Sequence, residues 1–193
     1  MKKFELTAES KNNIFGKKLF RIKALISFGD VEEGETGGWI EKEENLEQSS
    51  GNAWVYGDAG VYGNAWVYGD AWVYGDAEVY GDAEVSGNAR VSGNARVSGD
   101  AEVYGNARVY GNAEVSGNAD YTTIHGFGTQ FRTTTFFQCE DKQIRVSCGC
   151  FLGTIPEFRE QVKNTREGKI AEEYLMIADL MEKHFVKEKE SGE

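Results

Sequence analysis

The sequence predicts a mainly β protein built around a solenoid, which is a rod of short strands wound into stacked coils. Two observations in residues 51–120 predict this fold: a six-residue period that never slips, and a Gly-Asn or Gly-Asp pair between successive repeats. The unit is Ala-x-Val-(Tyr/Ser)-Gly-(Asn/Asp), and valine keeps its place in eleven successive units. These valines are Val55, Val61, Val67, Val73, Val79, Val85, Val91, Val97, Val103, Val109 and Val115.

Each part of this unit has a physical role. Ala and Val alternate with two outward positions, as on a short strand that buries one face. Gly-Asn and Gly-Asp favour tight corners, because both residue types tolerate positive φ. One strand of four residues cannot bury its apolar face alone, so the coils must stack on one another. A period of six does not produce the 3.6-residue stripe of an amphipathic helix, which excludes a helical interpretation.

The repeat resembles that of the hexapeptide-repeat left-handed parallel β-helix, in which three hexads close one triangular coil of 18 residues. The left hand is implied by this resemblance, since general crossover rules favour the right. We expect Ile40 and Leu46, six residues apart, to fill valine positions of a first, irregular coil, with a short insertion at Glu47–Ser50. Three segments also resemble uncharacterised β-helix proteins of bacteria, phages and prophages, some of them labelled acetyltransferases from fold alone. These segments are Phe28–Val31, Gly37–Leu46 and Ile144–Phe151.

Caps are expected at both ends, because an open coil exposes unpaired strand edges. The predicted organisation is an N-terminal β cap at 1–38, the solenoid at 39–120, and a C-terminal cap at 121–193. Strands are expected at 4–6 and 18–25, and a hairpin at 133–139 and 144–150. Thr154 is a suitable N-cap for a helix that Gly168 ends, and a second amphipathic helix is expected at 170–185. We expect residues 187–193 to fray.

Charge and composition exclude several classes of function. The chain has 32 acidic and 21 basic residues and a net charge of −11. This balance argues against direct nucleic-acid binding, which needs clustered Lys and Arg. No apolar run approaches the roughly 20 residues of a membrane span, and the first residues lack the apolar core of a secretory signal. We therefore expect no membrane association and a location in the cytoplasm, and the resemblance to phage and prophage proteins implies that the cell is a bacterial host.

Residues 18 apart share a face if three hexads close a coil. On the first face the outward column reads Trp54, Trp72, Arg90, Arg108, followed along each strand by Tyr56, Tyr74, Ser92, Tyr110. On the second face these columns read Gly60, Glu78, Arg96, Glu114 and Tyr62, Tyr80, Ser98, Ser116. On the third face they read Trp66, Glu84, Glu102, Asp120 and Tyr68, Ser86, Tyr104. The third face therefore carries an acidic stripe made of Glu84, Glu102 and Asp120.

Aromatic residues gather outward on the first coils. Strand propensity does not explain this polarity, because every hexad forms the same strand. Either the N-terminal cap covers these residues, or they bind a protein partner or a second copy of the chain, since Trp and Tyr dominate binding hot spots. A cap of 38 residues is short for three faces, so we expect partner binding or self-association. The predicted binding residues are Trp54, Tyr56, Tyr62, Trp66, Tyr68, Trp72, Tyr74 and Tyr80.

The sequence gives few candidates for chemistry. Many hexapeptide-repeat proteins are acyltransferases with a histidine base, but the hexads here contain no histidine. His125, just past the last hexad, is the one weak catalytic candidate. Cys148 and Cys150 on one strand would face the same side, and Cys139 could lie across the hairpin, which makes these three cysteines with His125 a weak candidate for a zinc site. Their spacing is not typical of a zinc site. We therefore expect buried thiols, no bound metal and no cofactor.

The predicted function is a non-catalytic solenoid that presents an aromatic and acidic surface to a macromolecular partner. A phage or prophage setting, which the resemblance implies, would make inhibition of a host defence protein the purpose of that binding. Whether the acidic rod imitates a nucleic acid stays open. The alternative is an acyltransferase that uses acetyl-CoA or another acyl donor.

Overall fold

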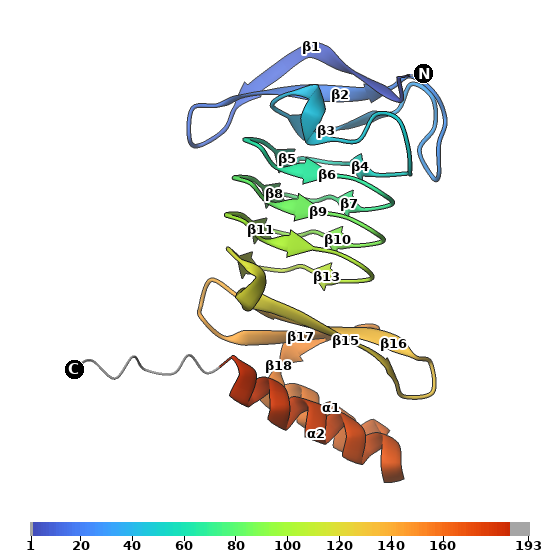
Figure 1. Ribbon diagram of the computed structural model, residues 1–193, viewed down its shortest axis with the longest axis vertical. Coiled ribbons are helices and arrows are strands. Elements are labelled where there is room, and N and C mark those ends of the chain that lie inside the picture. The colour runs from blue at the N-terminus through green and yellow to red at the C-terminus, as the bar shows by residue number, and fades with distance from the viewer. Residues whose placement is uncertain (1, 186–193) are drawn as a thin grey trace, which may run out of the picture. The chain divides into compact units, whose positions relative to one another are not determined.

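The computed structural model describes residues 2–185 of the chain, which divides into two compact units, Met1–Asn118 and Ala119–Glu193. Short parallel strands stack into a β-solenoid of about four turns in the first unit (Figure 1). The second unit holds an antiparallel sheet followed by two helices. No helix within residues 2–185 is long and apolar enough to cross a membrane.

Three parallel ladders form the faces of the solenoid. The first face contains β4 (Trp54–Val55), β7 (Trp72–Val73), β10 (Arg90–Val91) and β13 (Arg108–Val109). The second contains β5 (Gly60–Val61), β8 (Glu78–Val79), β11 (Arg96–Val97) and β14 (Glu114–Val115). The third contains β6 (Trp66–Val67), β9 (Glu84–Val85) and β12 (Glu102–Val103). Paired strands lie 18 residues apart, which confirms the predicted coil length and columns.

The interior of the coils is made of alanine and valine, as the repeat predicts. Every hexad valine is fully buried, and the hexad alanines are at most 2% exposed. Backbone hydrogen bonds join successive coils: Trp72 N donates to the Ala89 carbonyl at 2.9 Å, and Tyr74 N donates to the Val91 carbonyl at 3.0 Å. Corner glycines have positive φ, and a Cβ on Gly81 would lie only 2.9 Å from Gly99 N. Side chains are therefore excluded where the corners stack.

An irregular coil precedes the regular ones. Ile40 pairs in parallel with Val61, and Leu46 forms a parallel bridge with Val67. Both side chains are buried. This confirms that they occupy valine positions, and the 21-residue offset to their partners agrees with a short insertion after Leu46.

The N-terminal strands extend the second face around the end of the solenoid. They are β1 (Phe4–Asn12), β2 (Lys18–Ala24) and β3 (Thr36–Ile40), with the short 3-10 helix η1 (Glu43–Asn45) after them. β1 and β2 pair antiparallel, as do β2 and β3, and β3 then pairs in parallel with β5. One seven-stranded sheet therefore contains both the cap and the second face, and Figure 1 shows β1–β3 lying across the first coils.

The short 3-10 helix η2 (Asn118–Asp120) spans the sequence boundary between the two units, and the unit Ala119–Glu193 begins within it. Its sheet has the order β15 (Tyr121–Phe127), β16 (Arg132–Gln138), β17 (Ile144–Cys148) and β18 (Phe151–Thr154). The predicted hairpin is confirmed as β16 and β17, whereas β15 and β18 were not predicted. Helices α1 (Ile155–Thr165) and α2 (Gly168–His184) pack apolar side chains against this sheet.

The start of α1 agrees with the prediction, whereas its end does not. Thr154 is the N-cap and its hydroxyl accepts a hydrogen bond from Glu157 N. The helix ends at Thr165, and Gly168 is the first residue of α2 rather than the end of α1. Gly168 has φ +57°, so it turns the chain into α2 instead of closing α1. The expectation for residues 187–193 lies outside the described residues.

Replacing Val85 with aspartate tests the inward register of the hexads. Val85 is fully buried between Val67 and Val103 of the adjacent coils. A carboxylate among these side chains should lower the free energy of unfolding by about 3 kcal/mol or more. Thermal denaturation followed by circular dichroism measures the loss. Ser86→Asp, on the outer side of the same hexad, is the control and should change the melting temperature little; an unchanged melting temperature for Val85→Asp would contradict the register.

Candidate functional site

The cap covers the first tryptophan of the first face. Trp54 is fully buried, and its ring meets Phe4 and Phe28 edge-on, with centroids 6.3 and 5.5 Å away. Gly37 permits this packing, because a Cβ there would lie 2.6 Å from Trp54 Cζ2. The prediction that Trp54 is available to a partner is therefore wrong, since its ring belongs to the contact between cap and solenoid.

The cap also covers the first tyrosine of the second face. Tyr62 is 3% exposed and packs with Leu19 and Trp39. Its ring stacks on that of Tyr80, with centroids 5.1 Å apart and planes 2° from parallel, and Phe15 contacts both rings. Burial raises the pKa of the Tyr62 hydroxyl. Tyr62 is thus a second wrong assignment to the binding surface, and Tyr80 is half-buried in the same stack.

Cap side chains satisfy carbonyl groups at the open end of the first regular coil. Lys3 Nζ donates to the Ser50 and Gly51 carbonyls, at 3.1 and 3.2 Å. Further donors are Lys11 Nζ to Asp58 O, Arg21 Nη1 to Gly57 O, and Asn45 Nδ2 to the carbonyls of Gly63 and Ala65. These bonds fix the cap over particular corners of the coil, and so determine which outer faces it covers.

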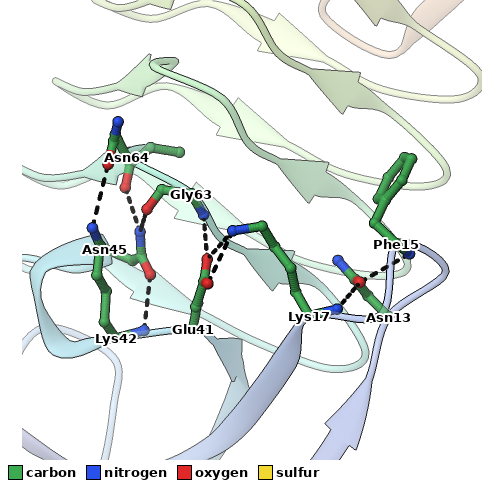
Figure 2. A network of polar contacts seen from close by, with 9 residues as sticks. Asn13, Phe15, Lys17, Glu41, Lys42, Asn45, Gly63 and Asn64 are labelled. Atoms are coloured by element: carbon green, nitrogen blue, oxygen red, sulfur yellow. Dashed lines mark hydrogen bonds and ion pairs between the residues drawn. The ribbon is translucent and has the colours of Figure 1, made fainter.

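Figure 2 shows a polar network that fastens the cap at the corner between the second and third faces. Both Glu41 oxygens accept from Lys17 Nζ at 3.0 Å, and Oε2 also accepts from Gly63 N at 2.6 Å. Asn13 Oδ1 accepts from the backbone N–H groups of Phe15 and Lys17, which shapes the loop between β1 and β2. Partial burial acts to raise the pKa of Glu41, but the Gly63 N–H and the Lys17 ammonium outweigh it and lower that pKa below the ordinary value of a glutamate.

The third face keeps an aromatic pair at its surface. Trp66 is 37% exposed and stacks on Tyr68, with ring centroids 4.0 Å apart. Tyr68 Oη donates to Glu84 Oε2 at 3.0 Å. Glu102 follows Glu84 in register on the next coil, and Tyr104 beside it is 59% exposed. We call Trp66, Tyr68, Glu84, Glu102 and Tyr104 the third-face patch.

The predicted acidic stripe has two of its three residues on paired strands of the solenoid. Glu84 and Glu102 are paired neighbours on β9 and β12. Asp120 lies in η2 rather than in a strand, and the unit boundary separates it from these two residues. Asn118 Oδ1 accepts a hydrogen bond from Glu102 N at 2.8 Å, where a further strand would otherwise pair. That Asp120 continues the stripe stays a prediction, because the last strand of the solenoid ends at Val115 and Asp120 belongs to the following unit.

The first face is aromatic at one end and basic at the other. Tyr56 is 46% exposed, and Trp72 and Tyr74 are half-buried. Arg90 and Arg108 follow Trp72 in register. A surface groove of about 210 Å³ lies among Tyr74, Arg90, Ser92, Arg108 and Tyr110, and we call it the first-face slot. All five residues stand in the outward columns read from the sequence, but only Tyr74 was among the predicted binding residues.

The residues considered for chemistry do not converge. His125 is exposed on β15, and its Nδ1 lies 3.2 Å from Thr133 Oγ1. Cys148 pairs with Thr134 near one end of the hairpin, whereas Cys139 follows the other end of β16, so the expectation that it could lie across from Cys148 is wrong. Burial raises the pKa of Cys139 to about 11, which disfavours the thiolate that zinc binds.

Cys148 and Cys150 also do not share a strand. β17 ends at Cys148, which pairs with Phe151, so Cys150 lies exposed in the intervening turn, and the expectation of a buried thiol is wrong there. Within residues 2–185, no three His, Cys, Asp or Glu side chains are grouped so that they could hold a metal ion. The expectation that zinc is absent or dispensable rests on the spacing of the cysteines in the sequence, and it stays a prediction.

Comparison with known families supports the solenoid. A family model described as YdcK beta solenoid repeat matches residues 59–75, 83–99, 89–105 and 101–117. These matches lie within the regular coils, so this part of the chain is similar to that repeat. The description names a repeat and no reaction, and the similarity therefore extends to the fold. Comparison with curated proteins gives no match.

Alanine at Trp54 and at Trp66 should have different effects on stability. Removing the fully buried Trp54 ring leaves a cavity under the cap, and should lower the free energy of unfolding by about 3–5 kcal/mol. Removing Trp66 loses mainly one partly exposed stacked pair, and should cost less than about 1.5 kcal/mol. Chemical denaturation of each variant measures these values. Equal losses of unfolding free energy in the two variants would contradict the conclusion that the cap buries Trp54 and leaves Trp66 partly exposed.

The Glu41 network should make the cap sensitive to acid. A carboxyl whose pKa is lowered on folding stabilises the folded state above its unfolded pKa, and this contribution is lost as the pH falls through the folded value. Glu41→Gln should therefore destabilise the protein by about 1 kcal/mol at pH 7, and by less below pH 4. Urea denaturation at pH 7 and at a pH below 4 measures the difference in unfolding free energy between this variant and the unchanged protein. Glu43→Gln, which removes only the exposed ion pair with Lys2, is the control; the same pH dependence in both variants would contradict the role of Glu41.

Proposed function

We propose that this protein is a non-catalytic binding protein whose third-face patch docks on a basic surface of a macromolecular partner. The observation that carries the proposal is the stacked pair of Trp66 and Tyr68, exposed beside the carboxylates of Glu84 and Glu102. An exposed tryptophan next to paired like charges costs stability or solubility, and gains nothing for the interior of the coil.

The chemistry of the patch defines the partner surface. A tryptophan face attracts a Lys or Arg side chain through its quadrupole, and neighbouring carboxylates form ion pairs with the same cation. Tyr68 holds Glu84 in place through its hydroxyl, so one carboxylate is pre-positioned for such a contact. The net charge of −11 would further increase the rate of encounter with a basic protein.

Binding to a partner is favoured over self-association through this patch. Two copies that met through their third faces would bring glutamates together, which is unfavourable. The biological setting follows from resemblance: the partner would be a host defence protein, and the chain a phage or prophage product acting in the bacterial cytoplasm. Nothing in the patch depends on that setting, and any protein with an exposed basic surface of suitable shape satisfies the same chemistry.

Acyltransfer is the alternative function. It would need an acyl donor and a general base, for which His125 is the candidate. His125 has a threonine hydroxyl beside its ring, whereas a catalytic imidazole is usually oriented by a carboxylate or a backbone carbonyl. The third-face patch therefore has the groups that binding a basic protein needs, whereas His125 lacks the partner that a general base needs.

Affinity capture with matched variants tests the proposed function. The wild-type chain should retain a basic protein from a host lysate, and Trp66→Ala should weaken its binding about thirtyfold or more, as expected for a hot spot of about 2 kcal/mol. Glu102→Gln should weaken it less and reduce its salt dependence. Trp72→Ala, on the first face, is the control that should leave the partner bound.

Three outcomes would contradict the proposal. The first is equal loss of the partner with Trp66→Ala and Trp72→Ala. The second is a shift of the wild-type mass to a dimer or larger species in light scattering that Trp66→Ala abolishes, which would make the patch a self-association surface. The third is turnover of acetyl-CoA that His125→Ala abolishes, which would favour the acyltransferase.

A further inference from the structure

The first-face slot contains a gap in a column of tyrosine rings. Tyr62 and Tyr80 on the second face show that rings on adjacent coils can stack, with centroids 5.1 Å apart and planes nearly parallel. Tyr74, Ser92 and Tyr110 occupy one column on three successive coils, because the valines that precede them are paired. Ser92 is 9% exposed and lines the groove between the two tyrosines. The slot therefore has room for one flat ring where a stacked side chain would otherwise lie.

Positive charge lies beside this gap. Arg90 and Arg108 are direct neighbours on β10 and β13, and like charges in that position repel each other. Within residues 2–185, the Arg90 guanidinium makes no hydrogen bond or ion pair, and the hydrogen bond of Arg90 N to the Ala107 carbonyl belongs to the ladder between coils. Arg96 on the second face differs from Arg90 in this respect, because it has Glu78 at 3.7 Å on the adjacent coil.

The corners around these arginines are uncharged. The corner residues before and after Arg90 and Arg108 are all asparagines, whereas the corresponding corners around Trp72 are aspartates. The asparagines are Asn88, Asn94, Asn106 and Asn112, and the aspartates are Asp70 and Asp76. The solenoid thus carries a basic patch on an otherwise acidic rod, and this patch coincides with the ring-sized gap.

We propose that the first-face slot binds a small planar aromatic ligand that carries an oxyanion. The ring inserts between Tyr74 and Tyr110 above Ser92, and the oxyanion binds Arg90 and Arg108. Residues two apart on a strand are separated by about 6.6 Å, which sets the spacing between the ring and the oxyanion. A nucleoside monophosphate presents a base and a phosphate in this relation, and guanidinium groups bind phosphate through directed hydrogen bonds.

The ligand is a small molecule rather than a polymer. Residues 51–120 contain ten acidic and three basic residues, so a long polyanion that followed the rod would be repelled beyond the slot. A groove of about 210 Å³ suits one ring and its charged group. This site lies on a different face from the third-face patch, so the two proposals can fail independently.

Calorimetric titration of the full chain with adenosine monophosphate at low ionic strength tests the proposal. We expect saturable binding of one ligand per chain, weakened by added salt because it depends on the arginines. Adenosine and inorganic phosphate should each bind at least about tenfold more weakly, since each lacks one of the two contacts. If inorganic phosphate bound as tightly as adenosine monophosphate, the slot would be an anion site without a ring pocket, and the proposal would be wrong. If neither adenosine monophosphate nor salicylate, a smaller aromatic carboxylate, bound at all, the proposal would also be wrong.

Two variants with matched controls locate the site. Ser92→Tyr fills the gap with the ring that the column lacks, and should abolish binding while the melting temperature is retained. Ser86→Tyr fills the equivalent position between Tyr68 and Tyr104 on the acidic third face, and should leave binding unchanged. Arg90→Gln should weaken binding about tenfold, the effect of losing one charge-assisted hydrogen bond, whereas Arg96→Gln should not. Binding that survives both Ser92→Tyr and Arg90→Gln would overturn the assignment.

Discussion

The structure of the first unit depends on the parallel hydrogen-bond ladder between coils, and on the direction of that ladder. Most of the backbone N–H groups that join the coils donate to the coil that follows, as Trp72 N does to Ala89 O. The first regular coil therefore presents mainly carbonyl groups to whatever precedes it, and the last one presents mainly N–H groups. Unpaired groups of either kind are costly when buried, so the two ends need caps of opposite chemistry. Lys3, Lys11 and Arg21 supply donors at one end, and Asn118 supplies an acceptor at the other.

This requirement explains why a strongly acidic chain begins with a lysine-rich cap. The cationic side chains are placed by carbonyl groups at fixed corners, and their aliphatic stems and the neighbouring strands then cover apolar rings. Trp39 shows both effects, because Lys11 Nζ and Arg21 Cζ lie 4.6 and 4.7 Å from the centre of its ring while they also reach carbonyls of the coil below. Covering of the first and second faces is thus a consequence of how the end is capped. Trp66 stays exposed because the third face begins under η1, which supplies backbone pairing and the side chain of Asn45, without a large ring.

The hexad itself made most of the solenoid predictable. A period of six with Ala and Val inward determines the strands, the corners, the columns and even the role of Ile40 and Leu46, because neighbouring coils repeat the same local geometry. The cap was not predictable in this way. That Trp54 packs against Phe4 and Phe28 depends on Gly37, whose lack of a Cβ matters only once the chain has folded back over the coil. Asp120 shows a related limit of the repeat, because a sequence period can outlast the strands it predicts. The first-face slot was present in the columns, but its meaning needed the ring geometry of Tyr62 and Tyr80.

A solenoid separates the residues that stabilise it from the residues that recognise other molecules. Alanine and valine fill the interior, so the outward positions can change without disturbing the core, and distant coils behave as nearly independent units. The two serines show the result. Ser92 and Ser86 both interrupt a column of tyrosines, but Ser92 lies beside Arg90 and Arg108 whereas Ser86 lies beside Glu84 and Glu102. The ligand proposed for the first-face slot is therefore anionic, whereas a group that binds beside Ser86 would have to be cationic, because the charge of the neighbouring column differs between the two faces.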